Sequence, residues 1–261
     1  MSTAAVDQEA QADRFGRAIE RNDGRDFPYY DGIPVHVASW KWIVVILACV
    51  LGFALLILLP QPTNLAALLP RILFPLVPFV TFAVLVRPQW SAIFRRVTGR
   101  DVLTMVVFWL LNLAVTFLVG ILVKALFGAA SNPAAGGVGE HGAVDLIAFY
   151  LGTGIQLFGE ELFTILPFLA VLYWMHRAGL GRKGAVLVAW LVTAVWFGAA
   201  HLPTYQWNVA QALLVIGVAR LVLTLAFIRT KNIWVSTGAH ILNDWATFTL
   251  VILTGLAVSA A

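Results

Sequence analysis

The sequence predicts an all-α fold, a polytopic transmembrane bundle of about seven helices. Of the 261 residues, 61% are hydrophobic and only 11% are charged, whereas about 25% of the residues in a soluble globular domain are charged. Apolar runs of about 20 residues, the length that crosses a bilayer as a helix, recur along the chain. Basic residues occupy alternate loops between these runs. These three observations together place the chain in a membrane.

The first 38 residues are polar and differ from the rest of the chain. They carry acidic residues among their arginines and lack the apolar segment and cleavage site of a signal peptide. We therefore expect a soluble, solvated cytoplasmic tail over residues 1–38 and a transmembrane helical domain over residues 39–261. The one cysteine, Cys49, lies in an apolar run, so no intrachain disulfide is possible.

Seven apolar runs are long enough to span a bilayer. The fourth is longer than one perpendicular span requires at 1.5 Å per residue. Its glycines, Gly152, Gly154 and Gly159, mark where we expect it to bend, break or begin as a separate short segment. The seven runs lie near residues 42–59, 66–86, 102–127, 145–175, 184–200, 208–228 and 233–258.

The basic residues give the orientation of these spans. Lysine and arginine occur before the first span and after the second, fourth and sixth, and the three other loops contain none. By the positive-inside rule, this alternation predicts a multi-pass protein of the cell (inner) membrane with a cytoplasmic N terminus and an outer C terminus. Because the basic residues are spread among the loops, the net charge of +4 reflects topology, and we expect no nucleic-acid binding.

Side chains that titrate or carry charge occur in, or at the end of, each of the last four spans. Charge at membrane depth costs several kcal/mol and usually faces a bundle interior or a water-filled cavity. A single such group is most often a structural ion pair or hydrogen bond, but a set of them is the inventory of a site. The set comprises Glu160, Glu161, His201, Arg220, His240 and Asp244, with the polar Asn243 beside the last.

The spacing of these residues assigns them to helix faces. Glu160 and Glu161 point about 100° apart on a helix, so they cannot serve one point equally. In later spans, His201 follows Phe197, and Asp244 follows His240, each by four residues, which places each pair on one face. Carboxylates, imidazoles and an amide from three spans could therefore converge, and such groups activate a water and stabilise an oxyanion.

An EE pair in one span, followed by FxxxH and HxxxN/D in later spans, resembles the CAAX prenyl protease and Abi (CPBP) family of intramembrane glutamic endopeptidases. The resemblance covers about residues 145–250. It implies a metal-independent protease without a cofactor, a hydrolase that cuts a membrane-associated peptide or a lipidated protein. The bilayer and such a substrate are the partners we expect.

The resemblance also implies roles for the residues. Glu160 and His201 would activate the water, and Glu161 would support the geometry of the histidine. His240, together with Asn243 or Asp244, would hold the oxyanion. The residue four positions after His240 is Asp244, where asparagine is common in the family. A charged Asp244 would repel an oxyanion, so either its carboxyl is protonated, as apolar surroundings favour, or Asn243 is the donor, and of the two we favour Asn243.

Position 165 departs from the family pattern. The pattern EExxxR calls for arginine there, and this chain has Ile165. Arg220, in the middle of the sixth span, either replaces the missing counter-charge or extends to the cytoplasmic surface. A second difficulty is depth: counted from the cytoplasmic ends, His201 lies roughly 25 Å deep and His240 about 12 Å. The two can meet only if a span is tilted, starts late or is irregular.

Three other functions are compatible with parts of the pattern. The chain could be a non-catalytic family member, such as a bacteriocin immunity factor or a peptide-binding membrane protein, and the absent arginine favours this. Two histidines and a glutamate would suffice for an open zinc site, although no HExxH motif occurs. A transporter is disfavoured, because the charged groups cluster in the last four spans without an inverted repeat.

Overall fold

The structure, a computed structural model, describes residues 13–132, 138 and 142–254, and in this part the fold is all-helical. Each of the seven predicted runs contains one helix. A 3₁₀ turn, η1 (Trp90–Ile93), precedes the third helix, and a π-helix, η3 (Gln211–Ile216), runs directly into the sixth. The seven helices are α2 (Ser39–Leu58), α3 (Leu68–Leu85), α4 (Gly99–Phe127), α5 (Ala143–Arg177), α6 (Arg182–Ala200), α7 (Gly217–Thr230) and α8 (Ile233–Thr254).

The prediction of a transmembrane bundle is confirmed. Among the described residues, six helices are long and apolar enough to cross a membrane: α2 to α6, and η3 together with α7. Helix α8 is not among the six, although it has 22 residues. Its sequence contains Ser236, Thr237, His240, Asn243 and Asp244, and these polar groups lower its hydropathy. The last helix is therefore less apolar than the others because it carries polar residues of the candidate site.

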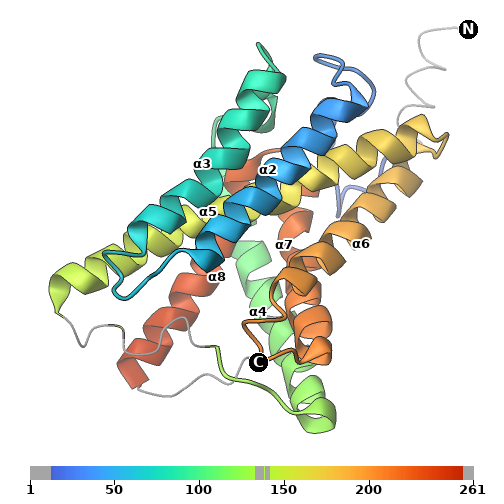
Figure 1. Cartoon of the computed structure of the whole chain (residues 1–261). Coiled ribbons are helices and arrows are strands. Elements are labelled where there is room, and N and C mark those ends of the chain that lie inside the picture. The colour runs from blue at the N-terminus through green and yellow to red at the C-terminus, as the bar shows by residue number, and fades with distance from the viewer. Residues whose placement is uncertain (1–12, 133–137, 139–141, 255–261) are drawn as a thin grey trace, which may run out of the picture.

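Helix α5 forms the centre of the bundle. It runs diagonally behind α2 and α3, as Figure 1 shows. In its most apolar 18-residue window, 78% of the residues are buried, whereas the corresponding windows of the other five candidate spans are 22% to 61% buried. Glu160 and Glu161 lie in the buried part of α5, so their carboxylates face protein.

The expected break in the fourth run is absent, because α5 is one continuous helix of 35 residues. Its glycines serve packing. A Cβ added at Gly159 would lie 2.7 Å from a ring carbon of Phe74, and one at Gly152 would lie 2.8 Å from Arg71 Nη1. The glycines let α3 approach α5 closely, and the excess length of α5 is accommodated by its diagonal course.

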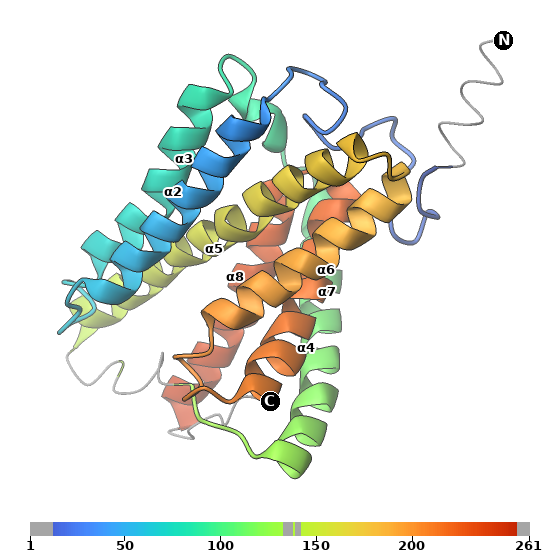
Figure 2. The ribbon, with the colours of Figure 1, turned by 45° about the vertical axis from the view of Figure 1, so that its right-hand side comes forward.

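The remaining helices pack on two sides of α5. Helices α2 and α3 pack against each other and against α5, while α4, α7 and α8 form a second group, with α6 between α5 and α7 (Figure 2). At the junction of α6 and η3, a Cβ on Gly198 would lie only 2.6 Å from the backbone oxygen of Ala212. The absence of a side chain there brings the end of α6 against the start of the sixth span.

The segment before α2 differs from the solvated tail that we expected, because residues 13–38 pack onto the bundle where they are described. Phe27 is buried in the main hydrophobic core. Arg182, at the start of α6, donates to both carboxylate oxygens of Glu20 at 2.9 and 2.7 Å, and Lys231 donates to Glu20 at 2.6 Å. Burial by itself would raise the pKa of Glu20, but these two cations outweigh it and lower the pKa to about 2.

Candidate active site

Glu161, Arg220 and His240 form a buried polar cluster from three helices. Arg220 Nη1 on α7 donates to Glu161 Oε1 on α5 at 2.6 Å, and both side chains are fully buried. His240 Nδ1 on α8 lies 2.9 Å from Arg220 Nη2 and 3.0 Å from Glu161 Oε1. A protonated Nδ1 would donate to Glu161, whereas an unprotonated Nδ1 accepts from Arg220 and leaves the ring proton on Nε2.

Glu160 lies on the other side of the same imidazole. Its Oε2 is 3.7 Å from His240 Nε2, and its Oε1 accepts a hydrogen bond of 3.0 Å from Gln156, one turn earlier on α5. Glu160 is 8% exposed, and Glu161 is fully buried. The two glutamates therefore differ as the 100° offset predicts: Glu161 forms an ion pair with an arginine, and Glu160 is held only by a neutral amide.

His201 joins this cluster through the ring of Phe197. The two ring centroids are 4.5 Å apart, and the same phenylalanine ring lies 6.3 Å from the ring of His240 and 4.2 Å from the guanidinium carbon of Arg220. His201 Nδ1 lies 2.8 Å from the backbone oxygen of Phe197. A carbonyl oxygen can only accept, so Nδ1 carries the proton, and Nε2 of neutral His201 has a free lone pair.

The depth difference between the two histidines has a structural explanation. His201 caps the end of α6, and His240 lies about two turns after the start of α8. The diagonal course of α5 and α6 and the irregular η3 bring these different heights together, and the close contact at Gly198 presses α6 onto the sixth span. Both imidazoles consequently lie against one ring, that of Phe197.

Of Asn243 and Asp244, Asp244 is the one whose side chain approaches Nε2 of His240. Asp244 Oδ1 lies 3.7 Å from this atom, and Asn243 Nδ2 donates to the same Oδ1 at 3.0 Å. Asn243 Oδ1 in turn accepts a hydrogen bond of 3.0 Å from the fully buried Asn112 on α4. Asn243 is thus held between Asn112 and Asp244, and one amide proton of Asn243 remains available.

The residue at position 165 is apolar, and so are its surroundings. Ile165 is fully buried in the main hydrophobic core, one turn after Glu161 on α5. The cation beside Glu161 comes instead from α7, where Arg220 Nη1 also approaches Thr164 Oγ1 at 3.5 Å. The cation that pairs with Glu161 is therefore an arginine from a different helix.

Two polar residues at the site escaped the sequence analysis. Gln156 contacts Glu160, and Asn112 contacts Asn243. Both are uncharged and therefore inconspicuous among apolar neighbours, although Gln156 precedes Glu160 by four residues and could have been found from helical spacing. Asn112 could not, because its partner is 131 positions away.

The carboxylates and imidazoles of the site differ from a metal-binding cluster in the described part of the chain. Within residues 13–132, 138 and 142–254, no group of three or more His, Cys, Asp or Glu side chains is arranged to hold a metal ion. The side chains of Glu160, Glu161 and His240 are instead engaged with Gln156, Arg220 and one another. Metal independence itself stays a prediction, to be tested with chelators.

Comparison with known proteins identifies the segment that carries this cluster. Residues 141–246 match the family model described as type II CAAX prenyl endopeptidase Rce1-like. The segment contains every residue of the cluster except Asn112. Neither a curated protein nor a solved structure matched the chain. The match covers less than half of the chain and supports an endopeptidase of the CAAX-protease type, while the long apolar helices support a multi-pass membrane protein.

Proposed function

We propose that the chain is an intramembrane glutamic endopeptidase that hydrolyses a peptide bond of a membrane-associated peptide or lipidated protein. The observation that carries the proposal is the unequal environment of the two glutamates. Glu161 is fully buried and paired with Arg220 at 2.6 Å, while Glu160 has no cation partner among the described residues and faces His240 across 3.7 Å. A carboxylate without a paired cation is free to take up a proton, and a paired one is not.

Glu160 is the general base in this mechanism, and His201 orients the water. The Nε2 lone pair of His201 accepts one hydrogen of the water, because its Nδ1 proton is directed to the backbone oxygen of Phe197. Glu160 accepts the other proton as the water oxygen attacks the carbonyl carbon of the substrate. Gln156 holds Glu160 in place without altering the charge of its carboxylate.

His240 stabilises the oxyanion that this attack creates. With Nδ1 accepting from Arg220, the proton of the ring is on Nε2, the atom that faces Glu160 and Asp244 at 3.7 Å each. A donor fixed in a water-poor site stabilises an oxyanion strongly. The second donor is a protonated Asp244 or the remaining amide proton of Asn243. Glu160 then gives its proton to the leaving amine as the peptide bond breaks.

Glu161 and Arg220 act as positioning residues. Their ion pair is fully buried, and Arg220 also contacts the imidazole of His240 and the ring of Phe197. This contact fixes the tautomer of His240 that donates from Nε2. Arg220 supplies, from α7, the counter-charge that the family pattern expects at position 165. The mechanism uses no metal ion and no cofactor.

The basic loops support a location in the cell (inner) membrane with the N terminus in the cytoplasm. In this orientation the segment before α2 and the loops after α3, α5 and α7 are cytoplasmic, and the C terminus is outside. Single cysteines placed in a cysteine-free chain at Arg96 and at Thr63 should react with impermeant maleimide from opposite sides of the membrane.

Substitution of Glu160 tests the proposed function. Purified protein in detergent or vesicles should cleave members of a panel of lipidated and unlipidated membrane peptides, and Glu160→Gln should abolish cleavage without changing thermal unfolding. Gln156→Leu removes the neutral partner of Glu160 and should leave reduced but measurable turnover. If wild type and Glu160→Gln bind the same peptides and neither cleaves, the chain is a peptide-binding protein and the catalytic proposal is wrong.

A further inference from the structure

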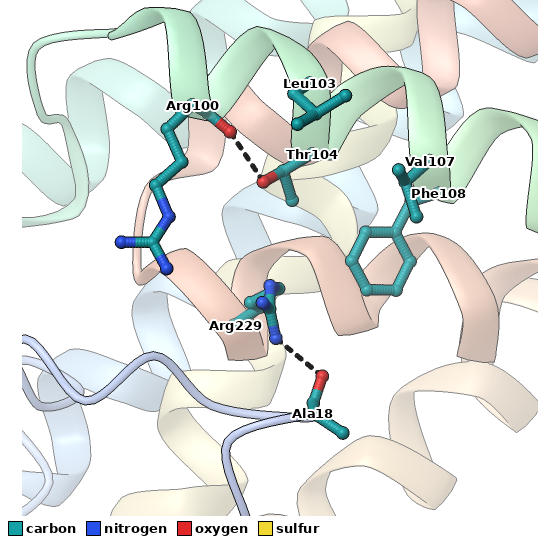
Figure 3. Close-up of a pocket in the computed structure, with 7 residues that line it drawn as sticks. All are labelled: Ala18, Arg100, Leu103, Thr104, Val107, Phe108 and Arg229. Carbon is teal, nitrogen blue, oxygen red and sulfur yellow. Dashed lines mark hydrogen bonds between the residues drawn. The ribbon is translucent and has the colours of Figure 1, made fainter.

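Two adjoining cavities lie at the ends of α4 and α7 that face the N-terminal segment, away from the glutamates and histidines. One, of about 270 Å³, lies between α4 and α7 and reaches Ala18 of the N-terminal segment (Figure 3). The second, of about 330 Å³, opens among charged residues of that segment. Arg100 and Arg229 line both cavities, so the two meet at these arginines, and together they are treated as one space.

This space is polar at one end and apolar at the other. Arg100, Leu103 and Val107 lie on one side of α4, and seven residues of helix separate the arginine from the valine by roughly 10 Å. Leu103 is 62% exposed and Val107 is 51% exposed, on a surface that faces the bilayer. Phe108 closes the inner side, where it is buried against α7. The space is thus charged at one end and lined by hydrocarbon side chains at the other, which suits an amphiphilic molecule that lies along the membrane normal.

The polar end has an excess of positive charge. Arg21 is paired with Asp101 at 2.6 Å, and Asp23 is paired with Arg25 at 3.8 Å. Arg229 donates only to backbone oxygens, at 2.9 and 2.6 Å, which leaves its charge uncompensated. Among the described residues, neither Arg100 nor Arg229 forms an ion pair. Two guanidinium groups without a carboxylate partner at a membrane surface attract an anion.

We propose that this space binds one anionic phospholipid, with its phosphate at Arg100 and Arg229 and an acyl chain against Leu103, Val107 and Phe108. A soluble anion would use only the polar half, and a zwitterionic lipid would bring a cation to the arginines. Guanidinium groups bind phosphate oxygens in a bidentate geometry. In the proposed orientation the site faces the cytoplasmic leaflet, which attracts basic groups through its anionic lipids. The site is independent of the proteolytic function.

The lipid should also stabilise the docking of the N-terminal segment. Arg229 Nη1 donates to the backbone oxygens of Arg17 and Ala18, so the group that would hold the phosphate also holds this segment. A bound phosphate would fix the guanidinium of Arg229 and, through it, these two residues. Proteolysis within residues 13–25 should therefore slow when the lipid is present.

The test is lipid retention by the purified full chain in neutral detergent, measured by native mass spectrometry. Phosphatidylglycerol is titrated against phosphatidylcholine with the same acyl chains. Wild type should retain phosphatidylglycerol selectively, and Arg100→Gln should weaken its apparent affinity by at least about fivefold, as expected for one arginine near a membrane surface. Arg100 is exposed and has no side-chain hydrogen bond in the described structure, so unfolding without lipid should be unchanged.

Arg96→Gln is the matched control, because Arg96 is an exposed arginine in the neighbouring loop that lines neither cavity. This variant should retain phosphatidylglycerol as wild type does. Val107→Trp, which fills the apolar half, should also weaken retention. If Arg96→Gln and Arg100→Gln lose equal affinity for phosphatidylglycerol, the effect of charge is diffuse. If wild type retains phosphatidylcholine as well as phosphatidylglycerol, the space is an apolar groove only. If glycerol 3-phosphate competes fully with the lipid, the space is a free-phosphate site. Each of these three results overturns the proposal.

Discussion

The ion pair between Glu161 and Arg220 gives the sharpest prediction about this bundle. Both side chains are fully buried and lie 2.6 Å apart, while Glu161 Oε2 and Arg220 Nε have no hydrogen-bond partner among the described residues. Removing one member of a buried pair leaves an uncompensated charge, which costs about 3–5 kcal/mol. Arg220→Gln and Glu161→Gln should each lower the free energy of unfolding by about that amount.

The double variant Glu161→Gln/Arg220→Gln should recover most of this loss. With both charges absent, no buried charge is left unpaired, and the desolvation penalty of the incompletely bonded pair also disappears. We expect the double variant to unfold within about 2 kcal/mol of wild type, so that the coupling free energy is at least about 4 kcal/mol, above the usual range for neighbouring residues.

The assay is reversible unfolding in mixed micelles, followed by circular dichroism as the fraction of denaturing detergent is raised. Arg177→Gln is the control, since Arg177 is exposed and its side chain makes one hydrogen bond, to Tyr173. Arg177→Gln should lower the free energy of unfolding by less than about 1 kcal/mol. If the losses of the two single variants add within about 0.5 kcal/mol in the double variant, Glu161 and Arg220 do not act as a pair, and the positioning role of Arg220 is refuted.

Three further predictions concern other parts of the molecule. Because the pKa of Glu20 is lowered from 4.5 to about 2, its ion pairs stabilise the fold above about pH 4.5 and are lost as pH falls toward 2; Glu20→Gln should flatten melting temperature across this range. Gly159→Ala should destabilise the protein by about 1–3 kcal/mol, because its Cβ would lie 2.7 Å from a ring carbon of Phe74. Gly184→Ala on α6 should not, because its Cβ would lie 3.8 Å from the nearest atom, Leu180 Cδ2. Thermal unfolding of the two variants makes the comparison. Cleavage by wild type should persist after dialysis against a strong chelator, and loss that zinc restores would contradict metal independence.

The helices themselves were predictable from the sequence. Each of the seven apolar runs contains one helix, because hydrocarbon solvent admits no unpaired backbone group and so enforces helical structure over any long apolar run. The length of α5 was also visible, but its continuity was not. Glycines in a membrane helix permit either a bend or a close contact, and which one occurs depends on the helix opposite, here the ring of Phe74 against Gly159.

The N-terminal segment was misjudged for a related reason. Its polar composition indicated solvation, yet Glu20 and Phe27 are buried. The charges that compensate Glu20 come from Arg182 and Lys231, 162 and 211 positions further along the chain. Composition reports the average preference of a segment, whereas burial of a charge depends on partners that only folding brings near.

The sequence by itself determined that the chain is a membrane bundle, and it singled out the charged and titratable residues of the candidate site, because charge in lipid is costly. The tertiary structure alone decided how they are paired. It placed Arg220 at Glu161, left Glu160 to Gln156, and set both imidazoles against Phe197. The physical reason is that residues on one helix have fixed relative directions, while the contacts between helices depend on crossing, tilt and the close approach allowed by glycines.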